Sequence, residues 1–210
     1  MNKNYWNKYY KLKKTKLNPS NFARFINNFF KKKKLNNLLE IGCGDGRDSF
    51  YFSQKLKKII SIDKSREAIK KNTLLLKKKK IKNLLFFSKD ITKIKKLRFN
   101  EFDILYARFF LHTINLKDED KLLTILKKRL KVNTYICLEF RTIKDEMFNE
   151  GEKLSNHERI TDHYRRFINV KDFRNKVKND FKILYCVAKK GFSKYRKENP
   201  HLCRIILKKI

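Results

Sequence analysis

The sequence lacks the signals of several protein classes. No apolar run approaches the length of a membrane span, so a transmembrane protein is not indicated. Residues 1–6 are polar and aromatic, without the apolar stretch of a signal peptide. A reduced, cytoplasmic protein is the simplest interpretation. We expect no metal site, because metal-ligand spacing is absent among the 4 cysteines, which are Cys43, Cys137, Cys186 and Cys203.

Acidic residues are few: the chain has 21 of them against 55 lysines and arginines, which gives a net charge of +34. Such an excess is typical of proteins that bind nucleic acids or anionic membranes. Most of it is lysine, in runs such as residues 31–34 and 77–80, among many Asn, Ile, Phe and Tyr. An A/T-rich genome encodes that mixture through composition alone. RNA binding is therefore the less favoured interpretation.

The apolar content excludes a disordered chain, since 41% of residues are hydrophobic and 13% are aromatic. The 210 residues suffice for one domain with its own core. Apolar runs alternate with helical segments, which predicts an α/β fold. The expected strands are 38–41, 58–63, 83–87, 101–108, 134–140, 181–188 and 202–207, and the expected helices include 49–56, 66–80, 118–130, 170–177 and one that Ser20 caps.

Three of the 5 glycines stand together in one short stretch, residues 42–46. The apolar run 38–41 before them reads as a buried strand, and the segment after them reads as a helix. Gly42, Gly44 and Gly46 can adopt positive φ, and they let a ligand approach the backbone closely. The free N–H groups of the helix would face that ligand. We therefore expect a nucleotide-like ligand at the carboxyl end of this strand.

Two nucleotide motifs are to be distinguished here. A dinucleotide fingerprint requires G-x-G-x-x-G, whereas this chain has G-x-G-x-G with Glu40 two residues before the first glycine. The stretch resembles motif I of the class I S-adenosylmethionine-dependent methyltransferases. The resemblance covers residues 36–210 in topology. It implies a Rossmann-like α/β fold with a seven-stranded, mostly parallel sheet, in which the last strand inserts antiparallel between the fifth and sixth.

Two further acids stand where such a cofactor needs them. Asp63 ends a strand about 20 residues after the glycines, where a carboxylate reaches ribose hydroxyls. Ser65 can cap the next helix, which weakens a capping role for Asp63. The resemblance implies adenine contacts from Asp90 and Ile91, and a contact of Arg47 with the methionine carboxylate. The expected cofactor-binding residues are Tyr10, Glu40, Gly42, Cys43, Gly44, Arg47, Asp63, Lys64, Asp90, Ile91 and Tyr106.

The acceptor side is expected at the ends of the next two strands. The sequence Tyr-Ala-Arg-Phe at 106–109 differs from the N-P-P-Y of nucleobase and amide methyltransferases, and it resembles the small-molecule branch. Segment 142–167 is predicted to be long and irregular, which favours a functional loop. Arginine is scarce here, so its use near this loop suggests bidentate contacts to phosphate or carboxylate; internal salt bridges are the alternative. The expected substrate-binding residues are Arg108, Arg141, Tyr164, Arg165 and Arg166.

His112 and His163 are the candidate bases, although a structural role for His112 is equally compatible with its position. Residues 1–35, with Tyr5, Trp6 and Tyr9, form either a lid over the cofactor or a segment docked on the domain surface. Residues 36–210 form the methyltransferase domain, with a loop insertion at about 141–167. The predicted function is methyl transfer from S-adenosylmethionine to an oxygen or nitrogen of a small anionic acceptor, such as a phosphorylated or surface-glycan precursor. An RNA methyltransferase and a non-catalytic anion- or RNA-binding module are the alternatives.

Overall fold

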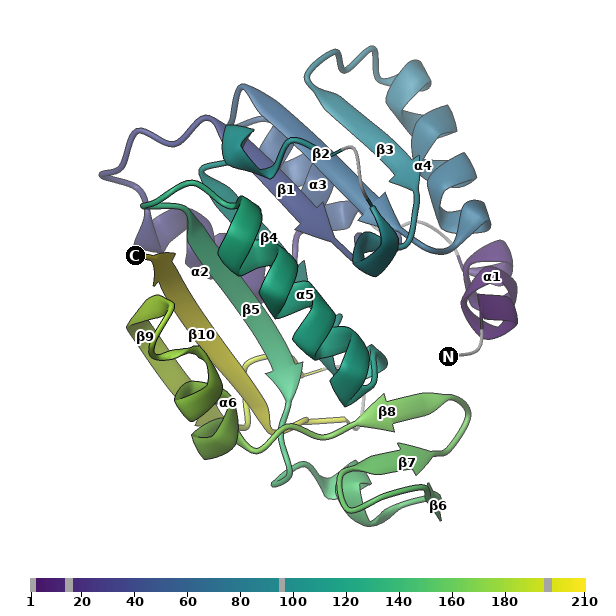
Figure 1. The fold of residues 1–210 in the computed structure, drawn as a ribbon. Helices are drawn as coiled ribbons and strands as arrows, with labels where there is room; N and C mark the ends of the chain where they lie inside the picture. Colours follow the sequence, from purple (N-terminus) through teal and green to yellow (C-terminus); the bar gives the residue numbers. More distant parts are fainter. Residues whose placement is uncertain (1–2, 14–16, 95–96, 195–197) are drawn as a thin grey trace.

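A seven-stranded sheet organises the protein in the computed structural model, which describes residues 3–13, 17–94, 97–194 and 198–210. The strand order is β3-β2-β1-β4-β5-β10-β9 (Figure 1). The strands are β1 Asn37–Ile41, β2 Lys58–Asp63, β3 Leu84–Ser88, β4 Ile104–Arg108, β5 Tyr135–Arg141, β9 Phe181–Lys189 and β10 Leu202–Lys209. The first five are parallel, and β10 pairs antiparallel with both β5 and β9. The predicted α/β class and the inserted last strand are confirmed.

Helices cover both faces of this sheet (Figure 1). The helices are α1 Lys3–Leu12, α2 Asn21–Phe29, α3 Arg47–Ser53, α4 Arg66–Lys78, α5 Leu116–Arg129 and α6 Val170–Val177. One core contains buried side chains of α2 and α3, and the other contains those of α5 and α6. Side-chain caps fix where several helices begin: Ser20 Oγ accepts from Ala23 N, and Ser65 Oγ accepts from Ala68 N. Both serine caps agree with the sequence.

The structure departs from the expected elements in three places. Helix α3 begins at Arg47, directly after the left-handed Gly46, and not at Ser49. Residues 99–101 form a short 3-10 helix, so β4 begins only at Ile104. Segment 142–167 is not irregular, because it folds into an antiparallel sheet of β6 Glu152–Lys153, β7 Glu158–Ile160 and β8 Tyr164–Arg166. No helix in the described ranges is both long and apolar enough to cross a membrane.

Helix α1 stands at the edge of the molecule and connects two parts of it. At its carboxyl end, the ammonium of Lys71 on α4 donates to the carbonyl of Tyr10 at 2.7 Å and to that of Lys11 at 2.8 Å. Near its beginning, the hydroxyl of Tyr5 donates to Asp162 at 2.6 Å, in the turn between β7 and β8. The amino-terminal helix therefore bridges α4 and the small sheet.

Candidate functional site

The glycine turn after β1 is held by backbone and side-chain hydrogen bonds. The N–H groups of Gly42 and Cys43 donate to the carbonyl of Ile62 at 2.8 and 3.2 Å. The carboxamide of Asn72, on α4, donates to the carbonyl of Gly44 at 2.9 Å. Gly46 has φ +73°, and a Cβ there would lie 2.9 Å from Asn72 Cγ. The turn is therefore rigid, and at this position it requires glycine.

Asp63 joins the turn to the end of β2. Its Oδ2 accepts the N–H of Gly44 at 2.9 Å, and its Oδ1 accepts the N–H of Ser65 at 2.8 Å. Burial raises the pKa of Asp63 above its usual value, and the two backbone donors act in the opposite direction. The carboxylate is thus fixed in orientation, with acceptor capacity left for further donors.

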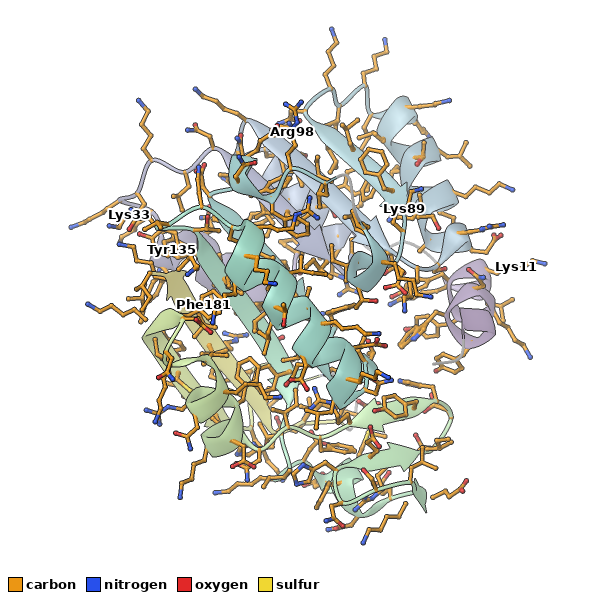
Figure 2. All side chains as sticks on the ribbon, viewed as in Figure 1. Lys11, Lys33, Lys89, Arg98, Tyr135 and Phe181 are labelled. Carbon is orange, nitrogen blue, oxygen red and sulfur yellow. The ribbon has the colours of Figure 1, made fainter. Side chains whose placement is uncertain are left out.

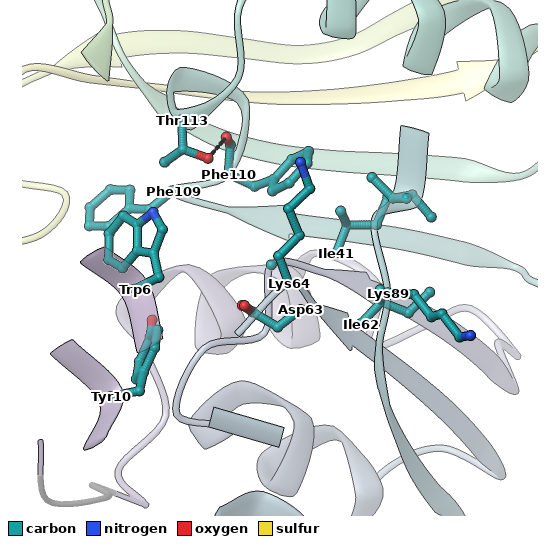
Figure 3. A pocket seen from close by; sticks show the side chains of 12 residues that line it. Trp6, Tyr10, Ile41, Ile62, Asp63, Lys64, Lys89, Phe109, Phe110 and Thr113 are labelled. Atoms are coloured by element: carbon teal, nitrogen blue, oxygen red, sulfur yellow. Dashed lines mark hydrogen bonds between the residues drawn. The ribbon is translucent and has the colours of Figure 1, made fainter. Parts of the chain in front are cut away.

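A cavity of about 530 Å³, part of it open to solvent, lies beside this carboxylate (Figure 3). Gly42, Asp63 and Lys64 line one side of the cavity, and Ile91 lines it as well. With Tyr10, which lines the cavity from α1, the structure thus brings together five residues that the sequence assigned to the cofactor.

Two rings of α1 cover the cavity from the other side. Trp6 and Tyr10 both line it, and Figure 3 shows both extending from α1 toward it. The Tyr10 hydroxyl occupies the space that a Cβ on Gly44 would fill. Burial raises the pKa of Tyr10, and the charges of Asp63 and Asp45 add to this. Of the two alternatives for the amino-terminal segment, this position favours a lid.

Beyond β4, the cavity is closed by Phe109, Phe110 and Thr113. Phe109 has φ +53°, which is uncommon outside glycine, and its N–H donates to the carbonyl of Glu139 at 2.9 Å. Such backbone conformations cluster at binding sites. These aromatic side chains give the cavity a mostly apolar wall opposite Asp63.

Several expected cofactor residues lie next to the turn without lining the cavity. Glu40 is buried on β1 and accepts hydrogen bonds from the hydroxyls of Ser49 and Ser61, the latter at 3.3 Å. Burial and the charge of Asp48 raise the pKa of Glu40. Burial likewise raises the pKa of Cys43. Glu40 therefore supports the glycine turn by joining β1 to the neighbouring α3 and β2.

Arg47 forms a bidentate ion pair with Asp45, with Nε–Oδ1 at 3.1 Å and Nη2–Oδ2 at 2.9 Å. Burial opposes ionisation of Asp45, but the Arg47 guanidinium holds its pKa below the usual value. Asp90 is likewise paired, at 2.9 Å, with the Lys64 ammonium. In this structure Arg47 is thus paired with Asp45, and Lys64 is paired with Asp90.

Tyr106 lies outside the cavity. Its ring is buried on the opposite face of β4, where it packs on Phe22 with the ring centroids 5.1 Å apart. Its hydroxyl donates to Asp48 at 2.7 Å. These contacts give Tyr106 a place in the core that α2 and α3 share, at a distance from the expected ligand.

His112 lies in the 3-10 helix Leu111–Thr113 and is buried. Its Nδ1 accepts the N–H of Arg141 at 3.3 Å, so Nε2 carries the proton of the neutral ring. Burial lowers the pKa of His112 strongly, and the nearby charges of Arg141 and Arg165 lower it further. At neutral pH this side chain is a hydrogen-bond donor through Nε2.

The other predicted residues of the acceptor side form contacts on or near the small sheet. His163 stacks on Tyr5 with the ring centroids 4.5 Å apart and meets Trp6 edge-on at 4.8 Å. Its Nδ1 lies 3.0 Å from Asp162, and burial together with Arg165 lowers its pKa to about 4. The hydroxyl of Tyr164 donates to Glu158, in the neighbouring strand.

The four expected arginines all have acidic partners. Arg141 pairs with Asp145 at 2.8 Å and with Glu198 at 3.2 Å. Arg165 pairs with Asp162 at 2.7 Å. Arg166 is buried against Glu119 of α5 and also donates to the carbonyl of Ile114 at 3.1 Å. Arg108 shares Glu139 with Arg204, at 3.0 and 2.6 Å. Pairing with the loop's own acids, the alternative left open by the sequence, therefore occurs at Arg141 and Arg165, whereas Arg166 pairs with an acid of α5.

The sequence did not indicate Phe109 and Phe110, which line the cavity, or Asn72, which holds the glycine turn. An Asn inside an amphipathic helix carries no local signal for a turn that lies 28 residues earlier. Phe109 and Phe110 directly follow a strand whose end was expected to face the ligand, so their position in the sequence could have indicated them.

Comparison with known proteins agrees with this geometry. A family model described as methyltransferase domain matches residues 32–188, which is most of the chain. The chain therefore belongs to this methyltransferase family. Among curated proteins, none matches the sequence.

The structure is similar to that of an S-adenosylmethionine-dependent methyltransferase from Clostridium acetobutylicum, with 15% identity, 90% of each chain covered and a TM-score of 0.70. It is similar to a second such enzyme from Methanosarcina mazei, with 18% identity, 89% of this chain and 97% of that one covered, and a TM-score of 0.72. N-methyltransferase NodS from Bradyrhizobium japonicum, in complex with S-adenosyl-L-homocysteine, matches with 14% identity, 89% and 85% coverage and a TM-score of 0.63. The family makes the protein a methyltransferase, and its fold is that of S-adenosylmethionine-dependent methyltransferases.

The residues present fit this cofactor. Gly44 lets another group approach the backbone closely, as the Tyr10 hydroxyl does in this structure, and Asp63 offers a fixed carboxylate for a ribose. The aromatic and aliphatic walls suit an adenosyl group, which is largely apolar on its faces.

Proposed function

We propose that this enzyme methylates an oxygen or nitrogen of a small acceptor that carries an anionic group, such as a phosphorylated or surface-glycan precursor. The observation that supports this most directly is the ion-paired unit at the ends of β4 and β5. The buried carboxylate of Glu139 accepts from Arg108 through Oε1 and from Arg204 through Oε2. Two guanidinium groups share one carboxylate, so the unit carries an excess positive charge.

Within this unit, Arg108 is the group that can meet an acceptor. Arg204 is buried, with its guanidinium 4.2 Å from the Phe192 ring centroid. The Arg108 side chain is 18% exposed, and its guanidinium lies 4.1 Å above the ring of Phe109, which lines the cavity. A phosphate or carboxylate on the acceptor would find planar donors there.

The remaining arginines support the anionic acceptor less directly. Arg166 is inside the protein, and its role is to join β8 to α5 through Glu119. Arg141 and Arg165 are mostly covered, and each holds an acid close to it in sequence. Their charges do reach His112, whose pKa they lower, so this side of the cavity is electrically positive.

Bound S-adenosylmethionine supplies an electrophilic methyl group, and the chain supplies alignment and exclusion of water. Asp63 and the backbone at Gly44 hold the adenosyl half in one orientation. Trp6 and Tyr10 on one side, and Phe109 on the other, cover part of the cavity. The acceptor approaches from the side of the small sheet and the carboxyl end of β4.

Proton removal is required only when the acceptor nucleophile is protonated, as in a hydroxyl. We assign that step to His163, because its ring packs edge-on against Trp6, which lines the cavity, and its Nδ1 lies 3.0 Å from Asp162 without a hydrogen bond to it. A pKa of about 4 keeps the His163 ring neutral at physiological pH. His112 then positions the acceptor as a donor through Nε2.

The test compares Arg108→Ala and Arg108→Lys with Arg174→Ala, which changes an exposed arginine on α6. Truncating Arg108 leaves Glu139 paired with Arg204, so the fold should persist. We expect turnover of phosphorylated or carboxylated acceptors to fall about 100-fold or more in Arg108→Ala, from the loss of a charged hydrogen-bond pair of about 3 kcal/mol. Affinity for S-adenosylhomocysteine should stay unchanged. If Arg108→Ala turned over anionic acceptors as fast as Arg174→Ala does, as both should for neutral acceptors, the proposal would be refuted.

A further inference from the structure

A second cavity adjoins the cofactor cavity on the side of the edge strand β3. It encloses about 920 Å³, is partly open to solvent, and shares Ile62 and Lys89 with the cofactor cavity. Its other walls include Phe87, Lys93, Ile94 and Leu97. The large apolar side chains of this strand are unusually open, since Phe87 is 40% exposed and Leu85 is 46% exposed. An aromatic ring flanked by lysines in a groove therefore faces solvent.

The charge around this groove is concentrated rather than uniform. Residues 68–100 contain 12 lysines and arginines and a single acid, Asp90. Residues 101–190, a segment almost three times as long, contain 20 basic and 14 acidic residues. A general bias toward lysine would raise the charge everywhere, but it would not remove the acids from one segment. Residues 1–39 likewise contain 11 basic residues and no acid, so the groove is distinguished by where its lysines lie and not by the charge of its segment.

One acid, Asp90, lines the groove in the described part of the chain. Asp90 is already paired with Lys64, and neither Lys89 nor Lys93 forms an ion pair with a described residue. Both lysines are exposed, and Figure 2 shows Lys89 next to the end of β3. This surface fits a ligand with many negative charges.

We propose that this groove binds a single strand of nucleic acid, with a base stacked on Phe87 and the backbone phosphates on Lys89 and Lys93. Stacking platforms bordered by positive side chains are how proteins bind single strands without sequence preference. An anionic membrane fits less well, because the exposed ring of Phe87 lies in a groove and not on a protruding surface. This binding is additional to the proposed methyl transfer and does not require it.

The experiment measures the fluorescence anisotropy of a labelled single-stranded RNA of about 15 nucleotides against the full-length protein at several salt concentrations. The variants are Phe87→Ala and Lys93→Glu. Phe87→Leu controls for loss of apolar area without stacking. Lys182→Glu controls for charge, because Lys182 is exposed on β9, at the opposite edge of the same sheet.

We expect the affinity of the wild type to fall linearly with salt on a double-logarithmic scale, with Lys93→Glu reducing that slope by about 1. Phe87→Ala and Phe87→Leu should each weaken binding about 10-fold, and Lys182→Glu should change it less than twofold. If Lys93→Glu and Lys182→Glu weakened RNA binding equally, binding would depend on overall charge alone, and the proposed site would be wrong. RNA binding by Phe87→Leu with the affinity of the wild type would also show that the proposed site is wrong.

Two further measurements decide between other occupants. Saturation with S-adenosylhomocysteine should leave RNA binding intact; if it abolishes binding, the groove belongs to the cofactor and the proposal fails. Sedimentation with vesicles that contain phosphatidylserine should leave the protein in solution under conditions where it binds RNA. Binding to vesicles without binding to RNA would overturn the proposal in favour of a membrane surface. Neither result bears on Arg108, so the two proposals stand or fall separately.

Discussion

Replacing Asp63 by Asn is the sharpest perturbation of the cofactor site, because it keeps shape and removes charge. The carboxylate accepts from two backbone donors, the N–H groups of Gly44 and Ser65, at 2.9 and 2.8 Å. An amide has one oxygen, so one of these N–H groups would face an NH₂ group. The variant should lose about 1–3 kcal/mol of unfolding free energy through the donor left without an acceptor.

The effect on ligand binding should be larger than the effect on the fold. The ribose hydroxyls lose a charged acceptor, which is a change of about 1.5–3 kcal/mol. At about 1.4 kcal/mol per factor of ten, the dissociation constant of S-adenosylhomocysteine should rise roughly 10- to 150-fold. Isothermal titration calorimetry measures this constant directly, without an acceptor substrate.

The pH dependence gives a second, independent readout. Burial raises the pKa of Asp63, so its carboxylate becomes protonated at a higher pH than an exposed aspartate does. Protonation removes an acceptor, and affinity should therefore weaken as pH falls through that raised pKa. In Asp63→Asn this dependence should disappear. Glu67→Gln, an acid-to-amide change on α4 with no hydrogen bond to the turn, is the matched control. Affinity within twofold of wild type in Asp63→Asn, with its pH dependence intact, would refute the role of this carboxylate.

Three other changes test the turn, the lid and the histidine next to it. Gly46→Ala forces a Cβ toward Asn72 at φ +73° and should lower the thermal midpoint by several degrees, for a loss of about 1–3 kcal/mol. Tyr5→Phe removes the hydrogen bond to Asp162 and should speed proteolysis within α1, with a few-fold loss of S-adenosylhomocysteine affinity. The pKa of His163 is about 4 in the folded protein, below the 6.5 of a free histidine, so the unfolded state binds the proton more readily between these values. Stability in urea should therefore fall as pH drops from 6.5 toward 4, by about 1–2 kcal/mol after solvent screening, and His163→Asn should flatten that slope.

The cofactor half of the site was predictable because its signals are local in the chain. The strand before Gly42 and the acid at the end of the next strand follow fixed spacings, and parallel pairing of β1 with β2 brings them together. Tyr106 shows where position along a strand is insufficient. Side chains alternate between the faces of a strand, so Tyr106 points away from Leu105 and Ala107 and into the core of α2 and α3.

The acceptor half was less predictable because its contacts join distant segments. The sequence does not distinguish an arginine that binds a ligand through two hydrogen bonds from one that pairs with an acid inside the protein. The carboxylate of Glu119, 47 residues before Arg166, decides that Arg166 is structural. The segment between β5 and α6, which was expected to be irregular, forms short antiparallel strand pairs. Strands of three residues are too short for their apolar pattern to predict them.

The two halves of the site also differ in how they can change. Asp63, Asn72 and the glycine turn hold one another through hydrogen bonds to the backbone, so a change in one disturbs the whole cofactor cradle. The acceptor side meets this cradle through the rings of α1, and α1 is tied to the small sheet by the Tyr5–Asp162 hydrogen bond. Changes in the small sheet should therefore move Trp6 and alter the KM for the acceptor, while the dissociation constant of S-adenosylhomocysteine shifts much less. That separation would be absent if the small sheet only stabilised the fold, because loss of folded enzyme lowers the apparent kcat and leaves both constants unchanged.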